Sequence, residues 1–458
     1  MPINANQQRK LGLFKLIMIT VISVDSIRNI PIAAQYGLSL VTFYVIAGAT
    51  FFLPLILITS RFASQYPNTG GSYLWIEAAF GKKIGFASIW LQWVYQLIWY
   101  PTIFAFIAST LASLIHPAWE TNVWFILALS LAGFWTMTWI STRGIEAASW
   151  MSSVGAIVGT ILPMALVILL AAIWLKSGHS SAVQYTVSGL VPSRQDMQNF
   201  GFFANILFSL LGLEVAAMHA GNVKMPEKTY RKAMCIAGVI ILASLIFSSL
   251  ALCTVLPPGQ IGLINGLMTA FKAFLDQDKM GFLLPWIGVA VILGGLGIAC
   301  SWIIGLARGL NVACQGSAIF PKLQVLNRQG MPYRILILQG VICSLLISLF
   351  LVFPNINNSY WLLSALTSQF ALMYYVLLFC AAIKLSAGAS KWGTGGLLSI
   401  LAILTSITGF AVGFIPPSNI LGGGILKYEL LMGSGLIVFC LPLLYFFRRK
   451  AHTQKPLP

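Results

Sequence analysis

Long apolar segments follow one another along almost the whole chain, separated by short polar stretches. A helix of roughly 20 apolar residues can cross the hydrocarbon core of a bilayer, which is about 30 Å thick. The pattern therefore predicts an all-α integral membrane protein with 12 transmembrane helices. The segments lie at about 12–36, 39–64, 84–115, 122–141, 149–176, 197–220, 233–256, 282–312, 333–353, 359–386, 393–415 and 427–448.

Composition supports a membrane location. Hydrophobic residues make up 58% of the 458 residues and charged residues only 8%, whereas charged residues are about a quarter of a soluble domain. A water-soluble protein could not cover its surface with so few charges, but a bilayer removes that need. The apolar run at 11–22 has no small-residue cleavage site after it, so we expect a first span there and no signal peptide.

The basic residues are unevenly distributed between the two sides of the predicted bundle. With an even number of spans, one side holds both termini and carries most of the 27 Lys and Arg residues. The opposite side holds Lys176, Arg194, Lys272, Lys279 and Lys427. The positive-inside rule then places both termini in the cytoplasm. The formal net charge of +17 reflects this topology and does not indicate nucleic-acid binding.

Two charged residues lie inside the first span, where burying a charge is costly. Asp25 and Arg28 are three residues apart, so on a helix they would share a face. Pro31 follows them and interrupts the hydrogen bonding of a helix. We therefore expect this span to be broken near its middle. Two roles stay open for the charged residues, a buried ion pair that holds the break or direct contact with a substrate.

A second break is expected in the sixth span, at 197–220. Gly212 and Glu214 interrupt its apolar run. Asp25 and Glu214 are the two acidic residues well inside predicted spans, and such residues usually face a cavity or a partner. Glu214 either accepts hydrogen bonds from the unwound backbone or acts as a coupling or gating group, and the sequence leaves both open.

The two breaks occupy corresponding positions in two halves of the chain. A first repeat of five helices would span about 12–176 and a second about 197–386, followed by two extra helices at about 393–448. Paired interrupted helices in equivalent positions of two repeats are the best sequence pointer to a transporter site. Free N–H groups at half-helix ends suit a carboxylate, and free carbonyls suit an ammonium. An amino acid fits this arrangement better than a sugar or a lipid.

A series of motifs has a recognisable order along the chain. The motifs are Tyr66-Pro67-Asn68-Thr69-Gly70-Gly71-Ser72-Tyr73, Glu77-Ala78-Ala79-Phe80-Gly81, residues 162–178, Gly212-Leu213-Glu214, Gly221-Asn222-Val223-Lys224-Met225-Pro226, Cys300-Ser301-Trp302-Ile303-Ile304-Gly305 with Arg308-Gly309, and Phe414-Ile415-Pro416-Pro417-Ser418-Asn419-Ile420. Over about residues 10–448 the chain resembles the amino acid–polyamine–organocation superfamily, and within it the bacterial glutamate–GABA antiporters. The resemblance implies a LeuT-like fold, a 5+5 inverted repeat plus two extra helices, and exchange of amino acids or their decarboxylation products.

The resemblance also implies roles for individual residues. Ser26 and Ile27 match the break of the first helix, which receives the substrate carboxylate. Phe208 and Leu211 match positions beside the ligand on the sixth helix. Trp302 matches an aromatic residue of the eighth helix that packs on the substrate side chain, although plain helix packing would also explain it.

Further candidates complete the predicted site. Gln96 and Tyr375 match cavity-lining positions on the third and tenth helices. Arg28 is added as a substrate-binding residue because of its charge inside the first span. Asp25 and Glu214 are the candidates for coupling or gating.

These observations predict a secondary active amino-acid transporter, and specifically an antiporter that works by alternating access. The alternative on the same fold is a proton-coupled symporter of amino acids or polyamines, with Asp25 or Glu214 carrying the proton. The four histidines are scattered without HExxH spacing, so we expect no enzyme, no metal site and no cofactor. The expected partners are a small amino acid or amine and the lipids of the bacterial inner membrane, and the expected assembly is a monomer or homodimer.

Overall fold

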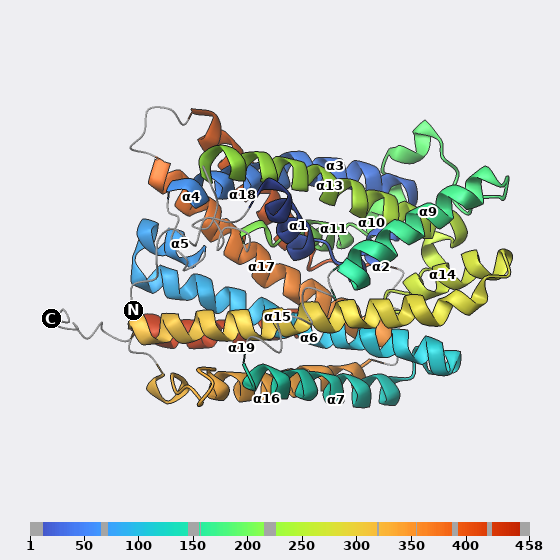
Figure 1. The fold of residues 1–458 in the computed structure, drawn as a ribbon. Helices are drawn as coiled ribbons and strands as arrows, with labels where there is room; N and C mark the ends of the chain where they lie inside the picture. The colour runs from blue at the N-terminus through green and yellow to red at the C-terminus, as the bar shows by residue number, and fades with distance from the viewer. Residues whose placement is uncertain are drawn as a thin grey trace.

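The fold is described from a computed structural model, drawn in Figure 1. The structure describes residues 12–65, 72–144, 155, 157–214, 226–317, 320–353, 355–386, 393–418 and 424–448. Within these ranges all regular secondary structure is helical. The α-helices are α1 (Leu13–Val24), α2 (Ile30–Ala34), α3 (Leu40–Ala47), α4 (Leu53–Gln65), α5 (Tyr73–Phe80), α6 (Lys82–Ile115), α7 (Val123–Thr142), α9 (Leu162–Lys176), α10 (Arg194–Gln198), α11 (Phe202–Ser209), α13 (Pro226–Val255), α14 (Gly266–Gln277), α15 (Leu284–Ser317), α16 (Tyr333–Ser348), α17 (Ile356–Ser386), α18 (Gly393–Val412) and α19 (Ile425–Arg448).

Shorter helical turns connect or extend several of these helices. The turn η1 (Ile27–Asn29) leads into α2. The turns η3 (Gly48–Phe52) and η5 (Ile157–Ile161) are single π-helical turns inside the second and fifth predicted spans. A π turn widens a helix locally, so the helical segments 40–65 and 157–176 are not uniformly α-helical.

The described residues contain ten helices that are long and apolar enough to cross a membrane. They contain an eleventh if Leu13–Val24 and Ile27–Ala34, which meet at 40°, form one bent span. Of the predicted sixth span, residues 215–220 lie outside the described residues. The predicted helical membrane architecture is confirmed, and the count of 12 spans stays a prediction.

The helices α6 and α17 form the centre of the bundle. Both are buried along most of their length, and α6 packs against both α17 and α15. In Figure 1, α6 and α15 run side by side, and α7 and α16 lie together on one outer face. The short helix α11 packs on α17, and α1 packs on α13. The two interrupted helices are therefore placed against the long helices α13 and α17.

The outer faces of the bundle are apolar. Trp124 on α7, Leu345 on α16, Leu397 on α18 and Ile437 on α19 are all largely exposed. In water such a surface would favour aggregation, whereas in a bilayer it contacts lipid acyl chains. This distribution fits a protein whose outside is solvated by lipid.

Glycines allow η5 and α15 to pack backbone against backbone. A Cβ atom at Gly294 would lie 2.5 Å from the Gly159 carbonyl carbon, and a Cβ at Gly159 would collide with the Gly294 backbone. Small residues at helix crossings let membrane helices approach closely, because the packing itself drives their association. The contact fixes α15, which contributes Trp302 to the site described below.

We expect Gly294→Ala to destabilise the bundle by about 1–3 kcal/mol, the usual cost of an added methyl group without space. Thermal unfolding of the purified protein in detergent measures the change. Gly305→Ala on the same helix is the matched control, since a Cβ there would meet nothing within 4 Å. Equal melting temperatures for the two variants would contradict the close packing of η5 on α15.

Candidate functional site

The first helix is interrupted by two extended residues. The helix α1 ends at Val24, and Asp25 and Ser26 have ψ angles of 124° and 114° before η1 begins at Ile27. The Asp25 N–H donates to the Val21 carbonyl at 2.8 Å, which closes the last turn of α1. Pro31 lies in the first turn of α2, where its missing N–H has little cost. The predicted break is present, and it precedes the proline.

The sixth span is interrupted at the residues that follow α11. Leu211 and Gly212 are not helical, and Gly212 has a φ of +113°, which favours glycine. The Gly212 N–H donates to the Tyr375 hydroxyl at 3.1 Å. A Cβ on Gly212 would lie 2.7 Å from the Ser23 carbonyl oxygen. The second break therefore lies directly against the end of α1, and the two breaks meet.

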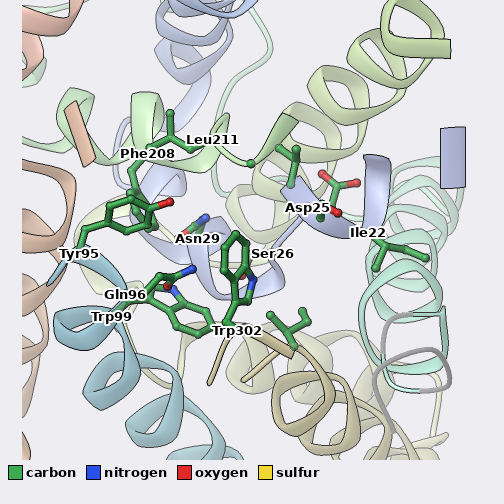
Figure 2. A pocket seen from close by; sticks show the side chains of 14 residues that line it. Ile22, Asp25, Ser26, Asn29, Tyr95, Gln96, Trp99, Phe208, Leu211 and Trp302 are labelled. Atoms are coloured by element: carbon green, nitrogen blue, oxygen red, sulfur yellow. The ribbon is translucent and has the colours of Figure 1, made fainter. Parts of the chain in front are cut away.

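One cavity lies where the two breaks meet (Figure 2). It is lined by residues of α1 and its break, of α6, of α11 and its break, and of α15. The lining residues are Ile22, Ser23, Val24, Asp25, Ser26, Asn29, Tyr95, Gln96, Trp99, Phe208, Leu211, Gly212, Ile298 and Trp302.

The cavity brings together six of the residues predicted from the sequence. They are Asp25, Ser26, Gln96, Phe208, Leu211 and Trp302. The other four lie outside the lining. Ile27 and Arg28 are buried without lining the cavity, and Glu214 and Tyr375 hydrogen-bond to each other.

The charged residues of the first break have separate partners. Both carboxylate oxygens of Asp25 accept from the Ser244 hydroxyl, at 3.1 and 2.9 Å. Arg28 is fully buried and donates to Thr102, Tyr360, Ser364 and Asn29. The Asp25–Arg28 ion pair that the sequence left open is therefore not formed.

The second break is held by a tyrosine. The Tyr375 hydroxyl on α17 donates to Glu214 Oε2 at 2.6 Å and accepts from the Gly212 N–H. The other carboxylate oxygen, Oε1, is buried without a partner in the described part of the chain. Tyr375 thus joins the unwound backbone and the buried Glu214 carboxyl group to α17.

Asn29, Tyr95 and Trp99 are among the lining residues of the cavity that sequence reasoning missed. Asn29 follows Arg28 in the polar cluster of the first break, and that position was the available signal. Tyr95 and Trp99 lie four residues apart on α6, on the same face of the helix. Because α6 is buried on all sides, its apolar pattern does not identify the face that meets a cavity.

No metal site is evident from acidic, histidine or cysteine side chains. The described ranges contain no group of three or more such residues that could hold an ion. The polar groups of the cavity are instead amides, hydroxyls, indole N–H groups and one carboxyl group. Such a set can hydrogen-bond a small polar molecule between aromatic rings.

The Tyr375 interaction gives a testable prediction. We expect Tyr375→Phe to lower stability by roughly 1–3 kcal/mol, because it leaves Glu214 buried without its donor, and to reduce transport. Thermal unfolding and uptake into proteoliposomes measure the two effects. Tyr428→Phe is the matched control, since its buried hydroxyl donates to the Gly413 carbonyl on another part of the bundle. Normal transport by Tyr375→Phe would contradict a role for this contact.

Solved structures establish the fold class. The structure of MhsT in complex with L-phenylalanine matches with a TM-score of 0.58 at 15% sequence identity. The match covers 87% of this chain and 98% of that one. The predicted LeuT-like fold is confirmed. The fold and the apolar surface define a multi-pass α-helical membrane protein.

Sequence comparisons establish the family. A family model described as amino acid permease matches residues 11–436. The chain belongs to the amino acid permease family of the amino acid–polyamine–organocation superfamily, as its motifs predicted. It is a transporter of amino acids or amines and not an enzyme.

Several curated relatives cover nearly the whole chain. An uncharacterized transporter of Legionella pneumophila is 38% identical over 95% of this chain and 96% of its own length. A glutamate/gamma-aminobutyrate antiporter of Lactococcus lactis is 23% identical over 94% of this chain and 89% of its own. A probable agmatine/putrescine antiporter of the same species is 26% identical over 83% and 80%.

Proposed function

We propose that this protein is an amino-acid antiporter that works by alternating access and binds its substrate in the cavity between the two helix breaks. The observation that best supports this is that both interrupted helices line one cavity. Asp25 and Ser26 come from the first break, and Leu211 and Gly212 from the second. Non-helical backbone at membrane depth is tolerated where it lines a cavity or is buried in protein. A substrate bound in this cavity would hydrogen-bond to the backbone groups that the breaks leave unpaired.

The half-helix ends suit the two charged groups of an amino acid. Residues 22–24 at the end of α1 line the cavity, and the last carbonyls of a helix lack partners and carry partial negative charge. They suit an ammonium group, and the Asp25 carboxyl group adds a further acceptor beside them. The second half of the helix begins at Ile27, and its first N–H groups suit a carboxylate.

Aromatic side chains suit the substrate side chain. Tyr95 and Trp99 on α6, Phe208 on α11 and Trp302 on α15 surround the cavity (Figure 2). Rings of this kind exclude water and contact aliphatic or aromatic groups. Because these rings come from three different helices, their arrangement changes when the helices move relative to one another. Alternating access requires such a movement.

Exchange is the mode of transport that the relatives favour. The glutamate/gamma-aminobutyrate antiporter and the probable agmatine/putrescine antiporter both carry antiport in their names. Obligatory exchange requires that the empty transporter changes conformation slowly, so that a bound substrate accompanies each transition. We further propose that the protein lies in the bacterial inner membrane with both termini in the cytoplasm, as its basic residues indicate.

A proton-coupled symporter is the second candidate. The observation in its favour is the Asp25 carboxyl group, which lines the cavity and is hydrogen-bonded to a serine hydroxyl and not to a cation. A carboxyl group in such a position could carry a proton together with the substrate.

Transport by reconstituted protein separates the two modes. Labelled amino acids and amines are offered to proteoliposomes with and without unlabelled amino acid inside. We expect uptake only into preloaded vesicles, because exchange needs a substrate on both sides. Uptake into empty vesicles that increases with an inward proton gradient would instead establish symport. In that case Asp25→Asn, whose amide oxygen still accepts from Ser244, tests whether the Asp25 charge is needed.

The location of the binding site gives a further prediction. We expect Trp302→Ala to weaken apparent substrate affinity about tenfold or more, because it removes one aromatic wall of the cavity. Concentration dependence of exchange measures the effect. Trp286→Ala on the same helix is the matched control, since Trp286 is 73% exposed on the outer face. Unchanged affinity in Trp302→Ala would place the substrate outside this cavity.

A further inference from the structure

Arg28 is a buried cation without an anionic partner. Its guanidinium donates to Thr102 Oγ1 at 2.9 Å, to the Tyr360 hydroxyl at 3.4 Å and to Ser364 Oγ at 3.3 Å. Its fourth acceptor is Asn29 Oδ1, at 3.0 Å. All four acceptors are neutral, and the described residues place no carboxylate in hydrogen bond with it. No opposite charge neutralises the guanidinium, so in the protein interior it still attracts an anion placed near it.

The guanidinium lies directly behind the wall of the cavity. Arg28 does not line the cavity, but its Cζ atom is 5.9 Å from the centre of the Trp99 ring and 5.8 Å from that of Phe208. Both rings are part of the lining. The positive charge is therefore separated from a ligand by a single layer of aromatic side chains. Because Arg28 is fully buried, ions in the solvent screen its charge only weakly.

Asn29 connects this charge to the cavity. A guanidinium has only donors, so Asn29 must turn its amide oxygen toward Arg28 and its NH₂ group away from it. Asn29 lines the cavity and is 2% exposed. Its Nδ2 atom has no acceptor among the residues that the structure describes. Arg28 thus occupies the amide oxygen of Asn29, and the NH₂ group of this cavity-lining residue stays available as a hydrogen-bond donor.

A second unpaired amide lines the same cavity. Gln96 is 5% exposed, and its Oε1 atom is buried without a partner within the described ranges. Buried polar groups are nearly always hydrogen-bonded, and an unpaired one calls for a ligand or water. Figure 2 shows Gln96 and Asn29 on the same side of Ser26, and Asp25 on the other side. The cavity therefore has the Asp25 carboxyl group on one side of Ser26, and on the other side the Asn29 amide donor with the Gln96 amide oxygen near it.

We propose that Arg28 is a positioning residue that makes the Asn29 end of the cavity a carboxylate subsite. Arg28 holds the Asn29 NH₂ group toward the ligand and supplies positive charge from behind the rings. The transporter then binds substrates through a carboxylate beside Asn29, while an ammonium group takes the Asp25 end. This assignment rests on the proposed function, since it requires that the substrate occupies this cavity.

The test compares ligands that differ in one carboxylate. Binding is measured on the full-length protein in nanodiscs by thermal stabilisation and by competition, with L-glutamate against γ-aminobutyrate, L-glutamate against L-glutamine, and L-arginine against agmatine. For wild type we expect at least one pair in which the ligand with the carboxylate binds more tightly. The ratio of the two affinities is the readout, because a purely structural defect weakens both members of a pair equally.

Two variants change the subsite in different ways. Asn29→Asp keeps the size of the side chain, pairs with Arg28 and removes the donor. In Arg28→Gln the new side-chain NH₂ group can still donate to the Asn29 amide oxygen, but the positive charge is removed. This variant provides the test if Asn29→Asp does not fold. We expect each to reduce the affinity ratio by about tenfold or more, as loss of a hydrogen bond to a charged group predicts. The ligand that lacks the carboxylate should change less than about threefold.

Asn199→Asp is the matched control. Asn199 is also buried, its Oδ1 accepts from the Ser418 N–H and hydroxyl, and it does not line the cavity. In Asn199→Asp the ratio of the affinities for the two ligands of a pair should equal that of the wild-type protein. An unchanged ratio in Asn29→Asp and Arg28→Gln, with wild type still binding, would overturn the subsite alone. Wild-type protein that binds none of these ligands would overturn the proposed function together with it.

Discussion

The close approach of Gly212 to the carbonyl oxygen of Ser23 holds the two interrupted helices together, and the architecture of the site depends on it. Each break leaves backbone groups without helical partners, and in a bilayer such groups must be satisfied by protein or face a cavity. At Gly212 the chain has a φ of +113° and no space for a side chain. Any larger residue would separate the breaks and open the cavity that they share.

The buried ionisable side chains around the cavity are held by hydroxyl groups and amides. Asp25 accepts from Ser244, Glu214 accepts from Tyr375, and Arg28 donates to neutral oxygens. An ion pair between two of them would neutralise both and would be costly to break. Hydroxyl partners keep these side chains in place without pairing them with one another, and Asp25 still lines the cavity where a ligand can reach it. This arrangement suits a site whose occupant carries charge and must leave again.

Much of the fold could be predicted from the sequence, because membrane spans and buried charges are strong signals. Asp25 and Gly212 correctly marked the two breaks, and Trp302 lines the cavity, while its packing on a substrate stays a prediction. The contacts that hold the site were not predictable. Tyr375 reaches Glu214 across 161 positions of the chain and lies outside the cavity lining. Such pairings arise from helix packing, and the sequence of a helix that is buried on all sides carries no pattern to indicate them.

The central claim is that a substrate lies between the two breaks. A cryo-EM structure of the protein in nanodiscs, saturated with an amino acid that it exchanges, tests this most directly. The account predicts ligand density between Ser26 and Gly212, beside Trp302. Density elsewhere, for example in the apolar cavity lined by Trp90, Trp93 and Leu310, with the space between the breaks empty, would contradict it.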